Sequence, residues 1–453
     1  MFACYNYFII FFAGKLICCF YKEEMLRRRQ NMSDQINRQL FQFIEKSPCS
    51  YHAVEQIKRE LTENGFTELR EQEAWKIDKG GKYFTSRNGS SLAAFCIPEK
   101  KLKGFHITAS HTDSPAFKIK ENMELQAEKH YTKLNTEKYG GMLMDSWLDR
   151  PLSVAGKIIV RDGEKLTEKL IHIEKDLLMI PRLAIHMKRG AEDDALNPQI
   201  HMLPVLGDQT AEKTFMRTAA SEAGVNENDI LGTDLYLYNR MPGTVWGANG
   251  EFMSAPRLDD LQCVFASLQA FVNSEGRENM NVFCAFDNEE VGSGTKQGAG
   301  STFLEDVLWR VNEALGRTGE QYRMAVAESF MISADNAHAV HPNQPGKADL
   351  TNRPYMNEGI VIKYSANQKY TTDAYSGAMM KHICEKAGVP YQTFHNRSDL
   401  PGGSTLGNIL TGSVSLKAVD IGLAQLAMHS VYETAGARDT EYMIRALQEF
   451  YRG

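Results

Sequence analysis

The sequence predicts an α/β fold whose layered core is interrupted by a β-rich insertion. Apolar runs typical of buried strands alternate with amphipathic helical patterns up to about residue 115 and again from about residue 246. Between these limits the chain has short strands of alternating hydrophobicity, separated by turn residues such as Asp162-Gly163. A chain of 453 residues also exceeds one ordinary hydrophobic core. We therefore expect one domain formed by residues 32–115 and 246–453, with residues 116–245 inserted into it.

The first part of the α/β domain is predicted from helix caps and turn residues. Ser33-Asp34 can cap a helix whose apolar positions continue to Ile44. A second helix is expected to end at Gly65, because glycine suits the position that follows a helix. Asn88-Gly89 lies between two apolar runs and predicts a β-hairpin. The next apolar run indicates a buried strand that ends at His111.

The second part of the domain shows a regular alternation of helices and strands. We expect a helix after Asp259, strands at residues 281–286, 329–333 and 414–421, and an amphipathic helix at the C-terminus. In open α/β sheets, ligands bind just beyond the carboxyl ends of the strands. Polar residues that directly follow these strands are therefore candidates for a functional site.

Composition excludes several classes of protein. The formal charge of −6 and the isoelectric point near 6.1 leave no basic stripe, so we expect no nucleic-acid partner. The eight cysteines form no Cys-x-x-Cys pair, which argues against a disulfide framework or a structural zinc knot. Several of them lie in apolar runs, where a reduced cysteine behaves as a small hydrophobic residue. This pattern indicates a reducing compartment, and we expect a cytoplasmic protein.

The first thirty-one residues differ from the rest of the chain. The apolar stretch from Tyr5 to Phe20 is shorter than the ~20 residues that a membrane-spanning helix needs. A secretory signal would carry positive charge before this stretch and a cleavage site after it, and neither is present. Basic residues follow it, so a membrane anchor remains an alternative. We prefer an extension outside the fold, residues 1–31, with no membrane association and a functional chain that begins near Met32.

Two adjacent carboxylates, Glu289 and Glu290, are the most informative feature of the chain. They follow the strand expected at residues 281–286 and precede a glycine-rich segment. In extended backbone neighbouring side chains point to opposite faces, so one glutamate could hold a metal while the other faces a substrate. A solvated acidic loop is the ordinary interpretation of an isolated pair. Polar residues elsewhere in the chain favour a site instead.

Four further residues lie where a strand or apolar run gives way to polar sequence. They are His111, Asp259, Asp335 and His429. Asp113 is two residues beyond His111, on the same face of an extended strand, and could orient its imidazole on a metal. Asp260 is expected to cap the helix that follows it.

These residues would form a chemically coherent site if the fold brought them together. The candidate ligands are His111, Asp259, Glu290, Asp335 and His429. Two imidazoles and three carboxylates suit zinc or a similar divalent cation. So many carboxylates repel one another unless cations neutralise them, and two metals ~3.5–4 Å apart are the familiar arrangement for amide hydrolysis. Glu289, free of metal, would take a proton from water and pass it to the leaving amine.

Five motifs in this order closely resemble those of the aspartyl aminopeptidase family of dinuclear-zinc metallopeptidases, from about Met32 to the C-terminus. The motifs are Ser110-His-Thr-Asp-Ser-Pro115, Arg257-Leu-Asp-Asp260, Asp287-Asn-Glu-Glu-Val-Gly-Ser293, Ser333-Ala-Asp-Asn-Ala-His-Ala-Val-His-Pro342 and Gln425-Leu-Ala-Met-His-Ser430. The resemblance implies a three-layer metallopeptidase domain with an inserted β-rich dimerisation domain. It also implies two zinc ions per subunit, with another divalent cation able to occupy one site.

The resemblance implies a role for each metal ligand. Asp259 would bridge the two metals. His111 and Asp335 would complete one site, and Glu290 and His429 the other.

The resemblance extends to residues that act on the substrate. Glu289 would be the general acid and base, with Asp113 supporting catalysis. His186 would reach the active site of a neighbouring subunit, although a buried core histidine is the ordinary interpretation of its apolar surroundings. His338 and Lys363 would contact the substrate, and the lysine would pair with an acidic side chain.

We therefore expect a zinc-dependent aminopeptidase that removes Asp or Glu from the free amino end of peptides. Its subunits would form dimers and a closed dodecamer. One alternative is a dinuclear-metal deacylase of N-acyl amino acids. Another is an inactive self-assembling relative that binds cargo; the presence of every candidate ligand and of the base argues against it.

Overall fold

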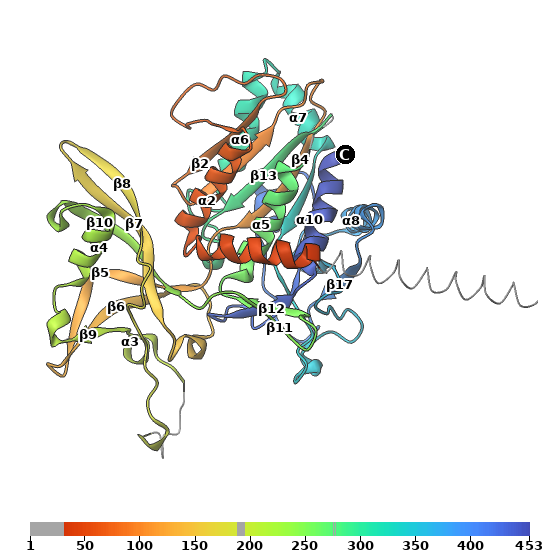
Figure 1. The fold of residues 1–453 in the computed structure, drawn as a ribbon. Helices are drawn as coiled ribbons and strands as arrows, with labels where there is room; N and C mark the ends of the chain where they lie inside the picture. The colour runs from red at the N-terminus through yellow and green to blue at the C-terminus, as the bar shows by residue number, and fades with distance from the viewer. Residues whose placement is uncertain (1–30, 188–194, 275, 277) are drawn as a thin grey trace, which may run out of the picture.

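The computed structural model describes residues 31–187, 195–274, 276 and 278–453. The predicted N-terminal extension lies outside the described residues, except for Asn31, which is helical. Figure 1 shows two lobes, an α/β lobe and a smaller β-rich lobe. No helix among the described residues is long and apolar enough to cross a membrane.

The predicted α/β class and three-layer arrangement are confirmed by a nine-stranded mixed sheet between two helical layers. In spatial order its strands are β1 (Thr67–Glu68), β2 (Lys82–Arg87), β3 (Ser91–Cys96), β13 (Met280–Phe286), β4 (Phe105–His111), β14 (Phe330–Ala334), β18 (Lys417–Gly422), β16 (Ile360–Tyr364) and β17 (Tyr391–His395). The central strands are buried on both faces, as near-continuous apolar runs predict.

Helices cover both faces of this sheet. One layer consists of a helix at residues 31–45, α2 (Ser50–Glu63), α5 (Leu258–Val272), α8 (Ala374–Ala387) and α10 (Asp439–Arg452), as Figure 1 shows in part. The other layer consists of α6 (Phe303–Ala314), α7 (Gly319–Glu328) and α9 (Leu406–Ser413). Each layer has its own core, so the sheet is enclosed between two apolar interfaces.

The β-rich lobe is a six-stranded antiparallel sheet with a separate core. In spatial order its strands are β8 (Lys165–His172), β7 (Leu152–Asp162), β10 (Ile230–Asn239), β5 (Ala116–Ala127), β6 (Tyr131–Tyr139) and β9 (Val205–Asp208). Helix α4 (Phe215–Ala223) packs into this core through Phe215 and Ala219, and α3 (Pro198–His201) is a short accessory helix.

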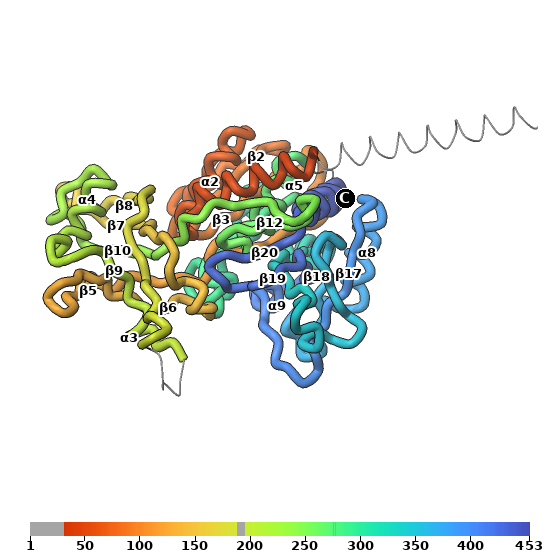
Figure 2. Tube along the Cα trace, turned by 60° about the horizontal axis from the view of Figure 1, so that its bottom comes forward, coloured from red at the N-terminus to blue at the C-terminus, as the bar shows by residue number. Residues whose placement is uncertain are grey.

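A third, five-stranded sheet adjoins both lobes. Its strands are β11 (Thr244–Trp246), β12 (Phe252–Ala255), β20 (Glu433–Gly436), β19 (Ala424–Leu426) and β15 (Ala337–His338). Figure 2 shows β12, β20 and β19 between the β-rich lobe and the β17–α8 side of the large sheet. The short 3₁₀ helices are η1 (Met144–Trp147), η2 (Ile185–Met187), η3 (Gln209–Ala211), η4 (Glu227–Asp229), η5 (Glu289–Val291) and η6 (Pro345–Lys347).

Two local predictions are confirmed and one is wrong. Gly65 follows the C-cap of α2 with a φ of 81°, and Asn88 and Gly89 form the left-handed turn between β2 and β3. The first helix is already formed at Asn31, so it does not begin at Ser33-Asp34. The Ser33 hydroxyl instead donates to Glu441 Oε2 at 2.5 Å and ties the first helix to the last.

The last helix is anchored through a buried hydroxyl. Tyr451 on α10 is 1 % exposed, and its Oη lies 2.5 Å from Thr108 Oγ1 on β4 and donates to the Val282 carbonyl on β13 at 3.0 Å. Strands β4 and β13 are neighbours in the middle of the large sheet, so this contact holds the helix against the centre of the sheet.

The substitution Tyr451→Phe should destabilise the fold, because it leaves two buried polar groups with fewer partners. We expect the free energy of unfolding to fall by about 1–2 kcal/mol, measured by urea denaturation followed by circular dichroism. Tyr442→Phe on the same helix is the control, since the Tyr442 hydroxyl has no hydrogen bond within the described residues. Equal denaturation midpoints for the two variants would contradict this account.

Candidate metal centre

Three neighbouring strands bring polar residues to one edge of the large sheet. Strand β4 runs parallel to β13 and to β14, with His111 beside Phe286 and Ala109 beside Ser333. His111 and the segments that leave β13 and β14 therefore meet at the same edge. Asp259 enters from the start of α5.

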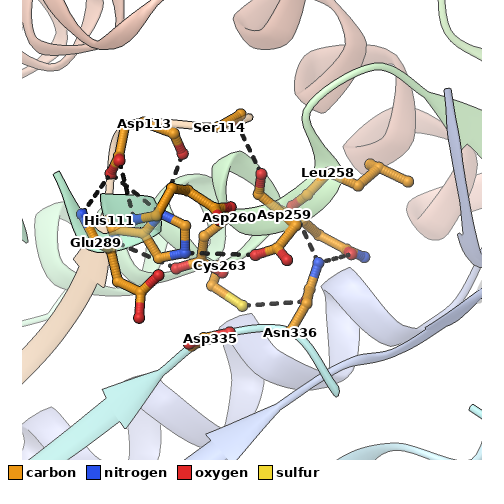
Figure 3. A network of polar contacts seen from close by, with 12 residues as sticks. His111, Asp113, Ser114, Leu258, Asp259, Asp260, Cys263, Glu289, Asp335 and Asn336 are labelled. Carbon is orange, nitrogen blue, oxygen red and sulfur yellow. Dashed lines mark hydrogen bonds and ion pairs between the residues drawn. The ribbon is translucent and has the colours of Figure 1, made fainter. Parts of the chain in front are cut away.

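The residues at this edge form three overlapping groups whose potential ligand atoms lie within 4.8 Å of one another in each group. The groups are His111 with Asp259, Asp260 and Asp335; His111 with Glu289 and Glu290; and Asp259 with Glu290 and His429. All five metal ligands expected from the sequence are therefore brought together, and Figure 3 shows His111 between Asp113 and Asp259.

Asp259 lies between the two imidazoles. Its Oδ1 is 3.4 Å from His111 Nε2, and its Oδ2 is 3.5 Å from His429 Nε2. His429 Nε2 also lies 3.4 Å from Glu290 Oε2. Each oxygen of one carboxylate thus faces a different histidine, the geometry that a bridging ligand requires.

Three buried carboxylate oxygens in this cluster have no hydrogen-bond partner among the described residues. They are Asp259 Oδ1, Asp260 Oδ1 and Glu290 Oε1. Buried polar atoms normally have hydrogen-bond partners, since a buried polar atom without one destabilises the fold. Burial, and then the charge of Asp259, also holds the pKa of Glu290 well above its usual value. The donor set of imidazole nitrogens and carboxylate oxygens fits zinc, which would satisfy these oxygens and offset their repulsion.

Asp113 holds three residues of the cluster in place by hydrogen bonds. The Nδ1 atom of His111 lies 3.0 Å from the Asp113 carbonyl oxygen, which directs Nε2 toward Asp259. The Asp113 carboxylate accepts the backbone NH of Glu289 at Oδ1 and that of Glu290 at Oδ2, both at 3.1 Å. Tyr139 donates to Oδ2 at 2.6 Å. One residue thus holds the histidine through its carbonyl oxygen and both glutamates through its carboxylate.

The glutamate pair does not have the extended backbone that the sequence suggested. Glu289 and Glu290 form the 3₁₀ turn η5, which starts after Asn288 in a left-handed conformation with a φ of 63°. The two hydrogen bonds to Asp113 impose this turn. Successive side chains in a 3₁₀ helix still diverge, because each residue advances by a third of a turn. Burial, opposed by His111 and reinforced by Asp335, raises the pKa of Glu289 to about 8.

Two acidic residues have roles that the sequence did not predict. Glu433, which is 2 % exposed, accepts the backbone NH of Asp259 at 2.9 Å and that of His429 at 2.7 Å. The sequence gives one indication of this role, since Glu433 lies only four residues beyond His429, in the next strand. Asp260 was expected to cap α5, but its Oδ2 accepts the backbone NH of His111 at 3.1 Å, so that prediction is wrong.

Lys363 and His338 lie in the pocket wall beside the cluster. Lys363 is 3 % exposed, donates to the Asn336 carbonyl at 2.8 Å and lies 3.4 Å from Asp335 Oδ1. Burial lowers the pKa of the lysine, but the neighbouring groups, Asp335 first among them, together outweigh burial and raise this pKa. Burial and the Lys363 charge lower the pKa of His338, which favours a neutral imidazole.

His186 lies apart from this cluster. It belongs to η2 in the β-rich part of the chain, is exposed, and does not line the pocket of the metal cluster. The alternative of a buried core histidine is therefore wrong. Its neighbours at residues 188–194 lie outside the described residues.

Comparison with known proteins decides the family. Residues 43–451 match the peptidase M18 family, described as aminopeptidase I zinc metalloprotease. The chain belongs to this family. It is 47 % identical over 423 residues to a probable M18 family aminopeptidase 2 of Clostridium acetobutylicum, covering 91 % of this chain and 98 % of that protein. The resemblance drawn from the five motifs and the expected class of zinc-dependent aminopeptidase are confirmed.

Solved structures have the same fold as this chain. A cryo-EM structure of the Ape4 and Nbr1 complex has a chain with a TM-score of 0.90 and 34 % identity, covering 93 % of this chain and 86 % of that one. The dodecamer of mApe1 from S. cerevisiae gives a TM-score of 0.81 and 27 % identity, with 93 % and 97 % covered.

The substitution Glu433→Gln should weaken zinc binding, because an amide nitrogen would face one of the two backbone NH groups that the carboxylate now accepts. We expect zinc affinity to fall by about 10–100-fold, measured by competition with a chromogenic chelator. Glu251→Gln is the matched control, since Glu251 also accepts a backbone NH, from Asn249 at 2.9 Å, but does not line the pocket. Unchanged zinc affinity in a folded Glu433→Gln protein would show that Glu433 does not hold Asp259 and His429 in place for zinc binding.

Proposed function

We propose that the chain hydrolyses the N-terminal residue of peptides with a pair of metal ions and a glutamate general acid and base. The observation that carries the proposal is Asp259, whose two oxygens face His111 and His429 within overlapping groups of ligands. Glu289 lies in the same pocket and forms no ion pair within the described residues. This arrangement supports two metals with one carboxylate left for proton transfer.

The proposed ligand assignment follows the groups. Asp259 would hold both ions, His111 and Asp335 would complete one site, and Glu290 and His429 would complete the other. Two zinc ions per subunit are proposed, and another divalent cation can occupy one site.

The proposed reaction assigns distinct tasks to chain residues. When bound, the ions would polarise the scissile carbonyl and activate water. Glu289 takes the proton of that water and transfers it to the nitrogen of the leaving peptide. Asp113 holds Glu289 in place through its backbone NH, at 3.1 Å. His338 in the pocket wall contacts the substrate.

A preference for Asp or Glu at the N-terminus is proposed from Lys363. Its ammonium has three donors, of which one meets the Asn336 carbonyl and a second faces Asp335. Within the described residues the remaining donor has no oxygen acceptor, only the Tyr370 ring at 5.5 Å, and it would pair with an acidic substrate side chain in the pocket.

Self-association is also proposed, with residues 116–245 as the inserted dimerisation domain between residues 32–115 and 246–453. The mApe1 relative from S. cerevisiae is a dodecamer. Ile185 and Met187 beside His186 are 76 % and 73 % exposed, which supports a contact of this segment with another subunit. In the assembly, His186 would enter the neighbour's active site. The proposed location is the cytoplasm.

The substitution Glu289→Gln should abolish proton transfer while keeping every proposed ligand. We expect turnover to fall by about 10²–10⁴-fold, with zinc content unchanged, measured by steady-state peptide cleavage and elemental analysis. Glu313→Gln, an exposed residue on α6, is the control and should keep full turnover. Normal turnover in Glu289→Gln would show that another group is the base.

A substrate panel should separate the proposed function from its alternatives. With zinc present, we expect Asp- and Glu-initiated peptides to be cleaved faster than Leu-initiated ones, and a chelator to abolish cleavage until zinc is restored. Cleavage of N-acetyl amino acids alone would identify a deacylase. No cleavage of any substrate by the zinc-loaded protein would favour the inactive cargo-binding alternative.

A further inference from the structure

Asp420 is a buried carboxylate close to the pocket but outside the metal cluster. It lies on β18 beside Ser333 of β14, is 0 % exposed, and forms no ion pair within the described part of the chain. A buried carboxylate needs hydrogen-bond donors in place of water. The identity of these donors indicates what Asp420 does.

Two separate loops supply those donors. Thr371 donates to Asp420 Oδ2 through its backbone NH at 2.5 Å and through its hydroxyl at 2.8 Å. Thr405 donates its hydroxyl to Asp420 Oδ1 at 2.7 Å. One carboxylate therefore joins the loop before α8 to the loop before α9.

Both loops form the wall of the pocket that contains the metal cluster. Tyr370, next to Thr371, lines this pocket, as do Gly403, Ser404 and Thr405. The Tyr370 ring lies 5.5 Å from the Lys363 ammonium, so the joined loops face the residue proposed to recognise the substrate side chain.

The hydroxyl of Thr405 does not cap the helix that follows it. Thr405 is the N-cap residue of α9, where a threonine side chain normally accepts a backbone NH of the first turn. Within the described residues the Thr405 side chain makes no such capping bond, and its hydroxyl donates to Asp420. Gly407 lets the helix approach this closely, since a Cβ atom there would lie 2.7 Å from Asp420 Oδ1.

We propose that Asp420 is a positioning residue for substrate binding, which fixes the two loops of the pocket wall relative to each other. The proposal rests on the proposed function, in that the pocket binds the N-terminal residue of a peptide. Asp420, Thr371 and Thr405 belong to none of the three metal-compatible groups. Loss of the contact should therefore weaken substrate binding and leave the chemical step intact.

The experiment replaces the Thr405 hydroxyl by a methyl group of similar size in the full chain. Thr405→Val should raise KM for an Asp-initiated peptide by about 10–100-fold, the usual effect of a misplaced binding group, with kcat within about two-fold and zinc content unchanged. Thr405→Ser restores the hydroxyl and should return KM to near its original value.

Thr411→Val is the matched control for this experiment. Thr411 lies on the same helix, and its hydroxyl donates only to the Asn408 carbonyl, away from Asp420. This variant should keep both KM and kcat. An unchanged KM in Thr405→Val, or a fall in kcat together with zinc content, would overturn the positioning role.

Hydrogen exchange provides a second readout that does not depend on activity. Thr405→Val should accelerate amide exchange in both loops, at residues 366–372 and 400–407, whereas Thr411→Val should not. Suppose that exchange is accelerated in both loops but the parent protein has no peptidase activity. The proposed function would then be wrong, whereas the link between the two loops would stand. Acceleration confined to residues 400–407 would refute the link between the loops.

Discussion

The crowding of buried carboxylates at the edge of the large sheet is the constraint on which the rest of the site depends. Asp259, Asp260 and Asp335 lie around His111, and Glu289 and Glu290 adjoin the same imidazole. Burial is the largest cause of the raised pKa of Asp260, Glu290 and Asp335. Lys363 pairs with Asp335 and His429 pairs with Glu290, whereas Asp260 has no ion pair within the described residues. Such a cluster requires cations, and its donors match those that zinc prefers.

The fold supports this cluster with backbone contacts rather than with flexible side-chain pairs. Asp113 accepts the NH groups of the glutamate turn, Glu433 accepts those of Asp259 and His429, and Asp260 accepts that of His111. Each contact fixes the main chain of a proposed ligand or, at Glu289, of the proposed base, so these residues are held in place by the fold itself. The same principle extends to Asp420, which fixes the loops around the substrate instead of the metals.

Much of this architecture could be predicted from local sequence. The strand that ends at His111 and the strands that precede the glutamate pair and Asp335 are apolar runs of ordinary length, and their parallel pairing places these residues at one edge. The hairpin at Asn88-Gly89 and the end of α2 at Gly65 also follow from local backbone preferences. The five motifs identified the family because they include every proposed ligand.

The unpredicted features depend on contacts between residues far apart in the sequence. Glu433 and Asp259 are 174 positions apart, and no periodic pattern relates them. The turn at Glu289 is imposed by Asp113, 176 positions earlier, so local preference could not reveal it. The first helix begins earlier than its apparent cap because Ser33 pairs with Glu441 instead. In each case a tertiary hydrogen bond overrides the local signal.

Zinc stoichiometry tests the central claim most directly. Elemental analysis of the full chain, after gentle purification and equilibration with zinc, should give about two ions per chain, and Asp259→Asn should lose both because the bridge is common to them. A parent protein with well under one ion per chain, or an Asp259→Asn protein that keeps both, would contradict the account.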